Sequence, residues 1–196
     1  MIPSTRVVSV VEPPTDTLVS LSEAKAHVRA QDFADDDLYL SGLLVAAEAH
    51  LSAPGQWFGR SLARRTLELS VACPAGPEVL PEPPFHEIVE ITFDDVAGVS
   101  QTLPLADVRK MPWVGDTVAV FPLSGRWPDI GPFGRLRVRY TAGYLAEDER
   151  AAPIRQAVLL MVAHWYANRE MLVDGRSAPT PMGVEALLNP LRIWGV

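Results

Sequence analysis

Cysteine is nearly absent from this chain of 196 residues, and Cys73 is the only one. A single cysteine excludes an internal disulfide and a metal site built from several thiolates. Long hydrophobic runs are also missing: the most apolar stretch, residues 157–163, is far shorter than the roughly 18 residues of a membrane-spanning helix. Residues 7–11 are too few for the apolar segment of a secretory signal. We therefore expect a protein made in the cytoplasm, or part of an assembly built there.

Positive charge is scarce as well. The chain has 17 Lys and Arg against 24 Asp and Glu, and its net charge of −7 argues against a free-standing nucleic-acid binder. Only Lys25 and Lys110 are lysines, so the basic residues are almost all arginines. This preference for arginine over lysine is explained either by the base composition of the genome or by the bidentate pairing that arginine forms at interfaces. Hydrophobic residues make up 48% of the chain, which is typical of a folded globular protein.

Hydrophobic periodicity predicts helices in both end regions of the chain. Ser20 and Glu23 form a capping box that opens a short helix over residues 23–30. Apolar residues at helical spacing predict a second helix over residues 37–51, which Pro54 and Gly55 end. Pro153 opens a long helix over residues 153–172, which we expect to pack against the second helix, and residues 183–189 form a short last helix.

The middle of the chain has the two-residue period of strands. The predicted strands cover residues 66–71, 87–93, 99–103, 107–111, 117–121 and 135–141. Helices and strands do not alternate, so the fold class is α+β rather than a doubly wound sheet. We expect one domain, with an extended arm (1–17), a helical core (18–61 and 144–189), a β-rich insertion (62–143) and a C-terminal tail (190–196).

Motifs for catalysis are mostly missing. The sequence contains neither standard phosphate-binding loop and no nucleophile elbow. His86, Glu87 and Glu90 resemble part of a zinc-protease motif, but the second histidine is missing and the segment is strand-like. His164 is either a core histidine or a catalyst, and residues 35–37, all Asp, suit either a divalent cation or a helix N-terminus. We expect no enzyme, no cofactor and no metal.

Three arginines, Arg135, Arg137 and Arg139, alternate with apolar residues, so a strand would place all three on one face. That face is either a solvated surface paired with acids such as Glu68 or Glu90, or a contact with another subunit or with DNA. Three phosphate contacts would be weak unless a ring repeated them.

Apolar residues in irregular segments are candidates for partner docking. Trp127, Ile130 and Phe133 lie in a loop rich in Gly and Pro, and are either tucked into their own domain or reserved for a partner. Ile193 and Trp194 in the tail pose the same alternative, and we expect Trp194 to be an anchor on a partner.

Taken together, the chain resembles the head-tail connector (adaptor) proteins of long-tailed bacteriophages, the gp6-like and gp8-like families, which also occur in prophages and gene transfer agents. No single matching segment is specific, but their order and spacing are. The segments span residues 18–192 and comprise 21–29 (LSEAKAHVR), 35–38, 46–49, 59–62, 80–84, 138–144 (VRYTAGY), 153–157, 164–170 (HWYANRE) and 183–188 (GVEALL).

The resemblance implies a virion structural protein at the head-tail junction, with no catalytic residues. Such subunits form a ring of about twelve copies through a head-to-tail interface that closes. The ring binds the portal protein and a stopper or tail-completion protein, and extends the DNA channel without sequence-specific binding. The alternatives are a DNA-binding or packaging accessory factor and, more remotely, a small hydrolase.

Overall fold

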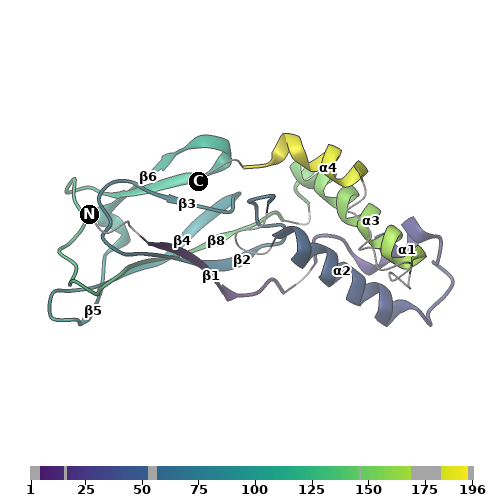
Figure 1. The fold of residues 1–196 in the computed structure, drawn as a ribbon, viewed down its shortest axis with the longest axis horizontal. Coiled ribbons are helices and arrows are strands. Elements are labelled where there is room, and N and C mark those ends of the chain that lie inside the picture. Colours follow the sequence, from purple (N-terminus) through teal and green to yellow (C-terminus); the bar gives the residue numbers. More distant parts are fainter. Residues whose placement is uncertain (1–4, 16, 53–56, 146, 169–181, 194–196) are drawn as a thin grey trace, which may run out of the picture.

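Two halves follow one another along the long axis of the molecule, a sandwich of strands and a group of helices (Figure 1). The computed structural model describes residues 5–15, 17–52, 57–145, 147–168 and 182–193. Each half has its own cluster of buried apolar side chains. The α+β class that the sequence predicts is confirmed.

The helical half comes from both ends of the chain. Its helices are α1 (Leu21–Val28), α2 (Asp37–Ser52), α3 (Ala152–Ala167) and α4 (Met182–Leu188). Ser20 caps α1, and Glu23 completes the capping box by accepting the Ser20 backbone N–H at 2.9 Å. The predicted packing of α3 against α2 is confirmed. Helix α3 ends at Ala167 with Asn168 as its C-cap, so the predicted extension to residue 172 is wrong, and residues 169–172 lie outside the described residues.

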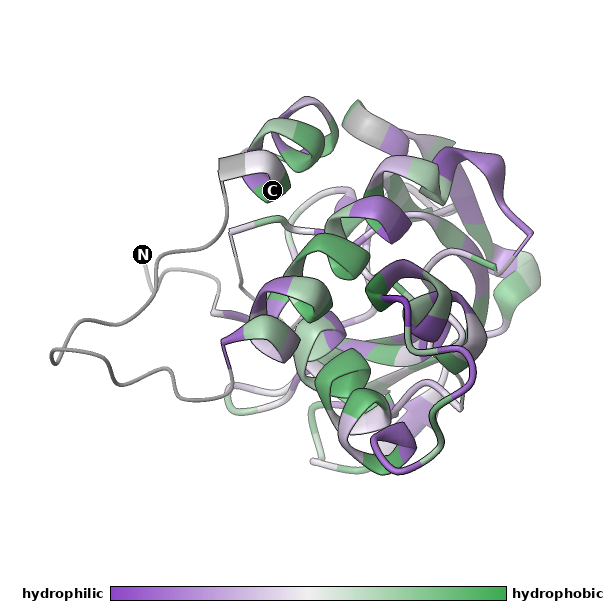
Figure 2. Cartoon of the chain, turned by 90° about the vertical axis from the view of Figure 1, so that its right-hand side faces the viewer, coloured by the Kyte–Doolittle hydropathy of each residue, from purple (hydrophilic) through white to green (hydrophobic). Residues whose placement is uncertain are grey.

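In each helix, one side is buried and the other is exposed. Leu40 and Leu44 of α2 and Ile154 and Val158 of α3 are almost fully buried in the shared core. Leu38, on the outer side of α2, is 87% exposed. The end of the molecule formed by the helices therefore presents both hydrophobic and hydrophilic residues (Figure 2).

The strands form two antiparallel sheets. The larger sheet has the order β1-β2-β8-β4-β5 and the smaller one β3-β7-β6. The strands are β1 (Arg6–Glu12), β2 (Arg65–Val71), β3 (Glu78–Leu80), β4 (Phe85–Asp94), β5 (Ser100–Thr102), β6 (Val108–Pro112), β7 (Val118–Pro122) and β8 (Leu136–Ala142). Single 3-10 turns precede β6, β7 and α3 and follow α4.

The two faces of the larger sheet differ in chemistry because side chains alternate along a strand. Leu67 and Leu69 of β2 pair with Tyr140 and Val138 of β8, and all four are fully buried. Their neighbours in sequence, including Glu68 on β2, lie on the opposite, outer face. The smaller sheet contributes Leu80 and Val120 to the same buried cluster, so the core of this half lies between the sheets.

Two strands were not among the sequence predictions. The segment expected to be an extended arm contains β1, which pairs with β2 from Arg6↔Val71 to Glu12↔Thr66. Its valines do not alternate with polar residues, and a register shift after Val10 breaks the period. Strand β3 has only three residues in a proline-rich stretch, too few to show a period.

Candidate interaction surfaces

The arginines that alternate in the sequence lie along β8 and the loop before it. Arg137 forms a bidentate ion pair with Asp94, at 2.9 and 2.8 Å. This contact lowers the pKa of the Asp94 carboxyl, because the guanidinium stabilises its charged form. The backbone N–H of Arg135 donates to the same carboxylate at 3.1 Å.

Arg139 lies between two acids on the neighbouring strands. Its guanidinium is 3.1 Å from the carboxylate of Glu68 on β2 and 3.7 Å from that of Glu90 on β4. Two of the three arginines are therefore neutralised by acids of the same chain. Arg135, Arg137 and Arg139, which we call the row, therefore carry little net positive charge to attract DNA phosphates.

The three apolar residues of the loop between β7 and β8 differ in how far they are buried. Trp127 is only 5% exposed, and its Nε1–H donates to the Gly76 carbonyl at 2.7 Å. Ile130 is partly buried against the sandwich core. Phe133 is 99% exposed. Trp127 is thus a core residue of its own chain, and only Phe133 offers its whole side chain to a partner.

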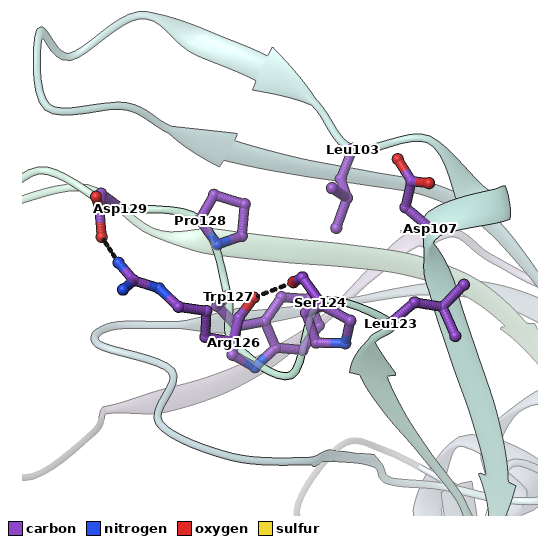
Figure 3. A pocket seen from close by; sticks show the side chains of 9 residues that line it. Leu103, Asp107, Leu123, Ser124, Arg126, Trp127, Pro128 and Asp129 are labelled. Carbon is purple, nitrogen blue, oxygen red and sulfur yellow. Dashed lines mark hydrogen bonds and ion pairs between the residues drawn. The ribbon is translucent and has the colours of Figure 1, made fainter.

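A surface cavity of about 400 Å³ opens beside this loop (Figure 3). Leu103, Leu123, Trp127 and Pro128 supply apolar walls. On its polar side, Arg126 and Asp129 pair with each other at 2.5 Å. Asp107 and Ser124 also line the cavity, and no lining residue is a histidine or a cysteine.

The C-terminal segment docks on its own chain as far as it is described. The Ile193 backbone N–H donates to the Phe58 carbonyl at 3.2 Å, and the Leu191 carbonyl accepts from the Arg60 guanidinium. Trp194 lies outside the described residues.

A buried ionic cluster joins the two halves, and the sequence analysis missed it. Arg65 and Glu82, 8% and 6% exposed, form an ion pair, and Arg65 also donates to the Ser52 carbonyl at the end of α2. Arg60, which is also buried, donates to the Tyr144 hydroxyl at 3.1 Å and pairs at 3.3 Å with Asp116, whose side chain is exposed. Arg60 and Tyr144 are 84 positions apart in the sequence, so no local motif marks this cluster.

The histidines and the aspartates that the sequence singled out lie in separate parts of the described structure. His86 Nε2 lies 2.6 Å from the Gly143 carbonyl oxygen, and His164 is half-buried on α3. In the acidic segment, Asp36 accepts the Tyr166 hydroxyl at 2.6 Å and Asp37 pairs with Lys25 at 2.6 Å. Among the described residues, no group of three or more His, Cys, Asp or Glu could hold a metal ion. In the same part of the chain, no helix has the length and apolarity needed to cross a membrane.

Known proteins resemble this chain in structure. No protein-family model and no curated protein matches the sequence. A chain from the neck of an empty gene transfer agent particle, computed with C6 symmetry, superposes with a TM-score of 0.76 at 26% identity, covering 97% of both chains. A chain from the virion of a native gene transfer agent particle gives the same values. A chain from the neck of a native gene transfer agent particle, computed with C12 symmetry, gives a TM-score of 0.63 at 25% identity, again over 97% of both chains.

Proposed function

We propose that this chain is a structural subunit of the neck of a tailed phage or phage-like particle, and that it has no enzymatic role. The observation that carries the proposal is the similarity to neck chains over 97% of both lengths, at a TM-score of 0.76. Similarity of that extent includes the sandwich, the helices and the order in which they follow one another. A shared short motif could not produce it.

Within the neck, the proposed role is that of a head-tail connector (adaptor). Copies of the chain form a ring below the portal protein, receive a stopper or tail-completion protein on the other side, and extend the channel for DNA. A ring of this kind needs one head-to-tail interface that closes on itself, which fits the C6 and C12 symmetries of the similar neck assemblies.

Passage of DNA does not require sequence-specific binding. The net charge of −7 and the internal pairing of Arg137 and Arg139 support a subunit that lets DNA pass rather than one that holds it. The alternative, a DNA-binding or packaging accessory factor, requires the isolated chain to bind DNA in a salt-sensitive manner.

Localisation in particles tests the proposal directly. The tagged full-length chain is produced in cells that assemble the particle, and purified particles are labelled with gold against the tag. Label at the head-tail junction is expected, and deletion of the gene should leave filled or leaking heads without tails, restored by the wild-type copy. Absence of the chain from purified particles, or salt-sensitive DNA binding by the isolated chain, would overturn the proposal in favour of the accessory factor.

A further inference from the structure

An apolar side chain projects from the end of the sandwich, and none of the described residues covers it. Phe133 is 99% exposed. Its loop is held in place, because the Gly131 N–H donates to the Asp94 carbonyl at 3.2 Å and the Gly134 N–H to the Gly131 carbonyl at 2.9 Å. On the adjoining β4–β5 turn, Val96 is 73% exposed. We call Phe133 with this turn the knob.

A hollow lies beside β1, an edge strand of the larger sheet. Its volume is about 240 Å³, and its apolar walls are Val8 of β1, Leu69 of β2, Pro81 and Ile193. An apolar cavity of about 150 Å³ is large enough to take up benzene, so this hollow can accommodate a phenyl ring. Arg6 and Glu82 also line it.

Strand β1, the edge strand beside the hollow, has backbone N–H and C=O groups that do not pair with β2. The Ala72 N–H donates to the Thr5 carbonyl, so Thr5 belongs to a hydrogen-bonded pair of the β1–β2 ladder. Because such pairs alternate along an antiparallel ladder, the backbone N–H and C=O of Arg6, Val8 and Val10 point away from β2. No strand pairs with this edge among the described residues.

Knob and hollow lie apart on the sheet, because the knob adjoins the last residue of β4 and the hollow adjoins β1. In the order β1-β2-β8-β4-β5, three strand spacings separate β1 from β4, or about 14 Å at 4.8 Å per spacing. A projection and a recess on different parts of one subunit suit a head-to-tail contact between identical copies, in which two unlike surfaces meet.

We propose that Phe133 of one copy inserts into the hollow beside β1 of the next copy, and that this contact repeats around the ring. The inference rests on the proposed function for the existence of the ring. It adds the surfaces that join the subunits: an aromatic anchor from the β7–β8 loop, and a receptor built from Val8, Leu69, Pro81 and Ile193. A few anchors of this type, buried in pockets, contribute most of the binding energy at protein interfaces.

Disulfide trapping tests which residues meet. The chain carries Cys73→Ser, to remove its exposed cysteine, together with Val8→Cys and Phe133→Cys. The trapping is done both on the purified chain and on particles that contain it. A ladder of covalent oligomers from the double variant, and none from either single variant, is expected. A dimer from Phe133→Cys alone would show a two-fold contact between knobs, and would overturn the proposal.

Sedimentation of surface variants tests the energetics. Phe133→Asp should weaken self-association at least about tenfold, because an anchor is lost and a charge enters an apolar hollow. Leu38→Asp is the matched control, since Leu38 is 87% exposed on the helical half, and it should associate as the wild type does. Phe133 has no role in the core, so its variant keeps the fold, which circular dichroism checks.

The outcomes separate this inference from the proposed function. If the chain is present in particles but gives no ladder there, the knob does not meet the hollow and only this inference fails. If Phe133→Asp still forms homo-oligomers but no longer enters particles, the knob serves a different neck protein, and the second-copy assignment is wrong. If the chain is monomeric in solution and absent from particles, both proposals fail.

Discussion

The carboxylate of Glu48 on α2 accepts a hydrogen bond of 2.6 Å from the backbone N–H of Leu18. It accepts a second, of 3.2 Å, from Val19, and Glu48 is only 5% exposed. One acid thus fixes the segment that leads from the sandwich into the helices. Burial raises the pKa of Glu48 to about 7, because loss of water penalises its charged form more than the two N–H donors stabilise it.

This raised pKa gives a pH dependence of defined sign. Between the usual value of 4.5 and about 7, the folded chain holds a proton that the unfolded chain has released, so stability falls as the pH rises through this window. At 1.36 kcal/mol per pKa unit, the loss is about 3 kcal/mol above pH 7. Glu48→Gln keeps an acceptor but does not ionise, so it should remove this fall and be the more stable protein at pH 8.

Urea unfolding at pH 5 and pH 8 checks the prediction. Glu149→Gln, on the surface, controls for the removal of one negative charge. Burial also raises the pKa of Glu78, and only the difference between wild type and Glu48→Gln isolates Glu48. Equal pH dependence in the two proteins would contradict the prediction.

The second prediction concerns the buried ion pair between the halves. Glu82→Gln leaves the Arg65 guanidinium, whose side chain is 6% exposed, without its counter-charge, and should cost about 3 kcal/mol of unfolding free energy. Replacing both residues by Met removes the unpaired charge, and should leave a protein more stable than the single variant. Chemical denaturation of the three proteins measures this, and a single variant as stable as the wild type would show that the pair is dispensable.

Most elements of the fold could be predicted because they carry a period. The capping box at Ser20, the apolar spacing of α2 and the alternation along β8 each report a local rule that the structure follows. Strand β1 lacked such a rule, since what stabilises it is pairing with β2, which is 54 or more positions away in the sequence. The same is true of the hollow and of the Arg65–Glu82 pair, whose parts meet only after folding.

The loop between β7 and β8 shows the same limit on what can be predicted from a sequence. Trp127 and Phe133 are both aromatic residues in one Gly- and Pro-rich loop, and composition does not distinguish them. The structure does, because the Gly76 carbonyl accepts the Trp127 indole N–H inside the core while Phe133 is left outside.

The third prediction distinguishes the arginines of the β8 row. Arg137→Gln loses the bidentate pair with Asp94 and should lower stability by up to about 1 kcal/mol, since the pair is partly exposed. Arg135→Gln is the matched control, because among the described residues its side chain forms no ion pair. Thermal unfolding compares the two.

The triple variant of Arg135, Arg137 and Arg139 to Gln tests the wider role of the row. We expect a folded chain with weaker assembly, as for arginines that also contact carboxylates of a neighbouring copy. Intact assembly combined with loss of DNA from particles would instead show that the row lines the channel.

The last prediction separates folding from docking in the C-terminal tail. Removing residues 190–196 deletes the Leu191 carbonyl, which accepts from the Arg60 guanidinium, a group only 6% exposed. A buried charged donor without its acceptor costs about 1.5–3 kcal/mol, so this truncation should destabilise the fold. Removing residues 194–196 alone keeps that bond and the one between Ile193 and Phe58, and should leave stability unchanged.

If Trp194 is an anchor on a partner, the shorter truncation gives a stable chain that no longer enters particles, measured by its amount in purified particles. A chain that lacks residues 194–196 and still enters particles at the wild-type level would exclude Trp194 as the anchor, and loss of stability on this short truncation would show that Trp194 belongs to the fold.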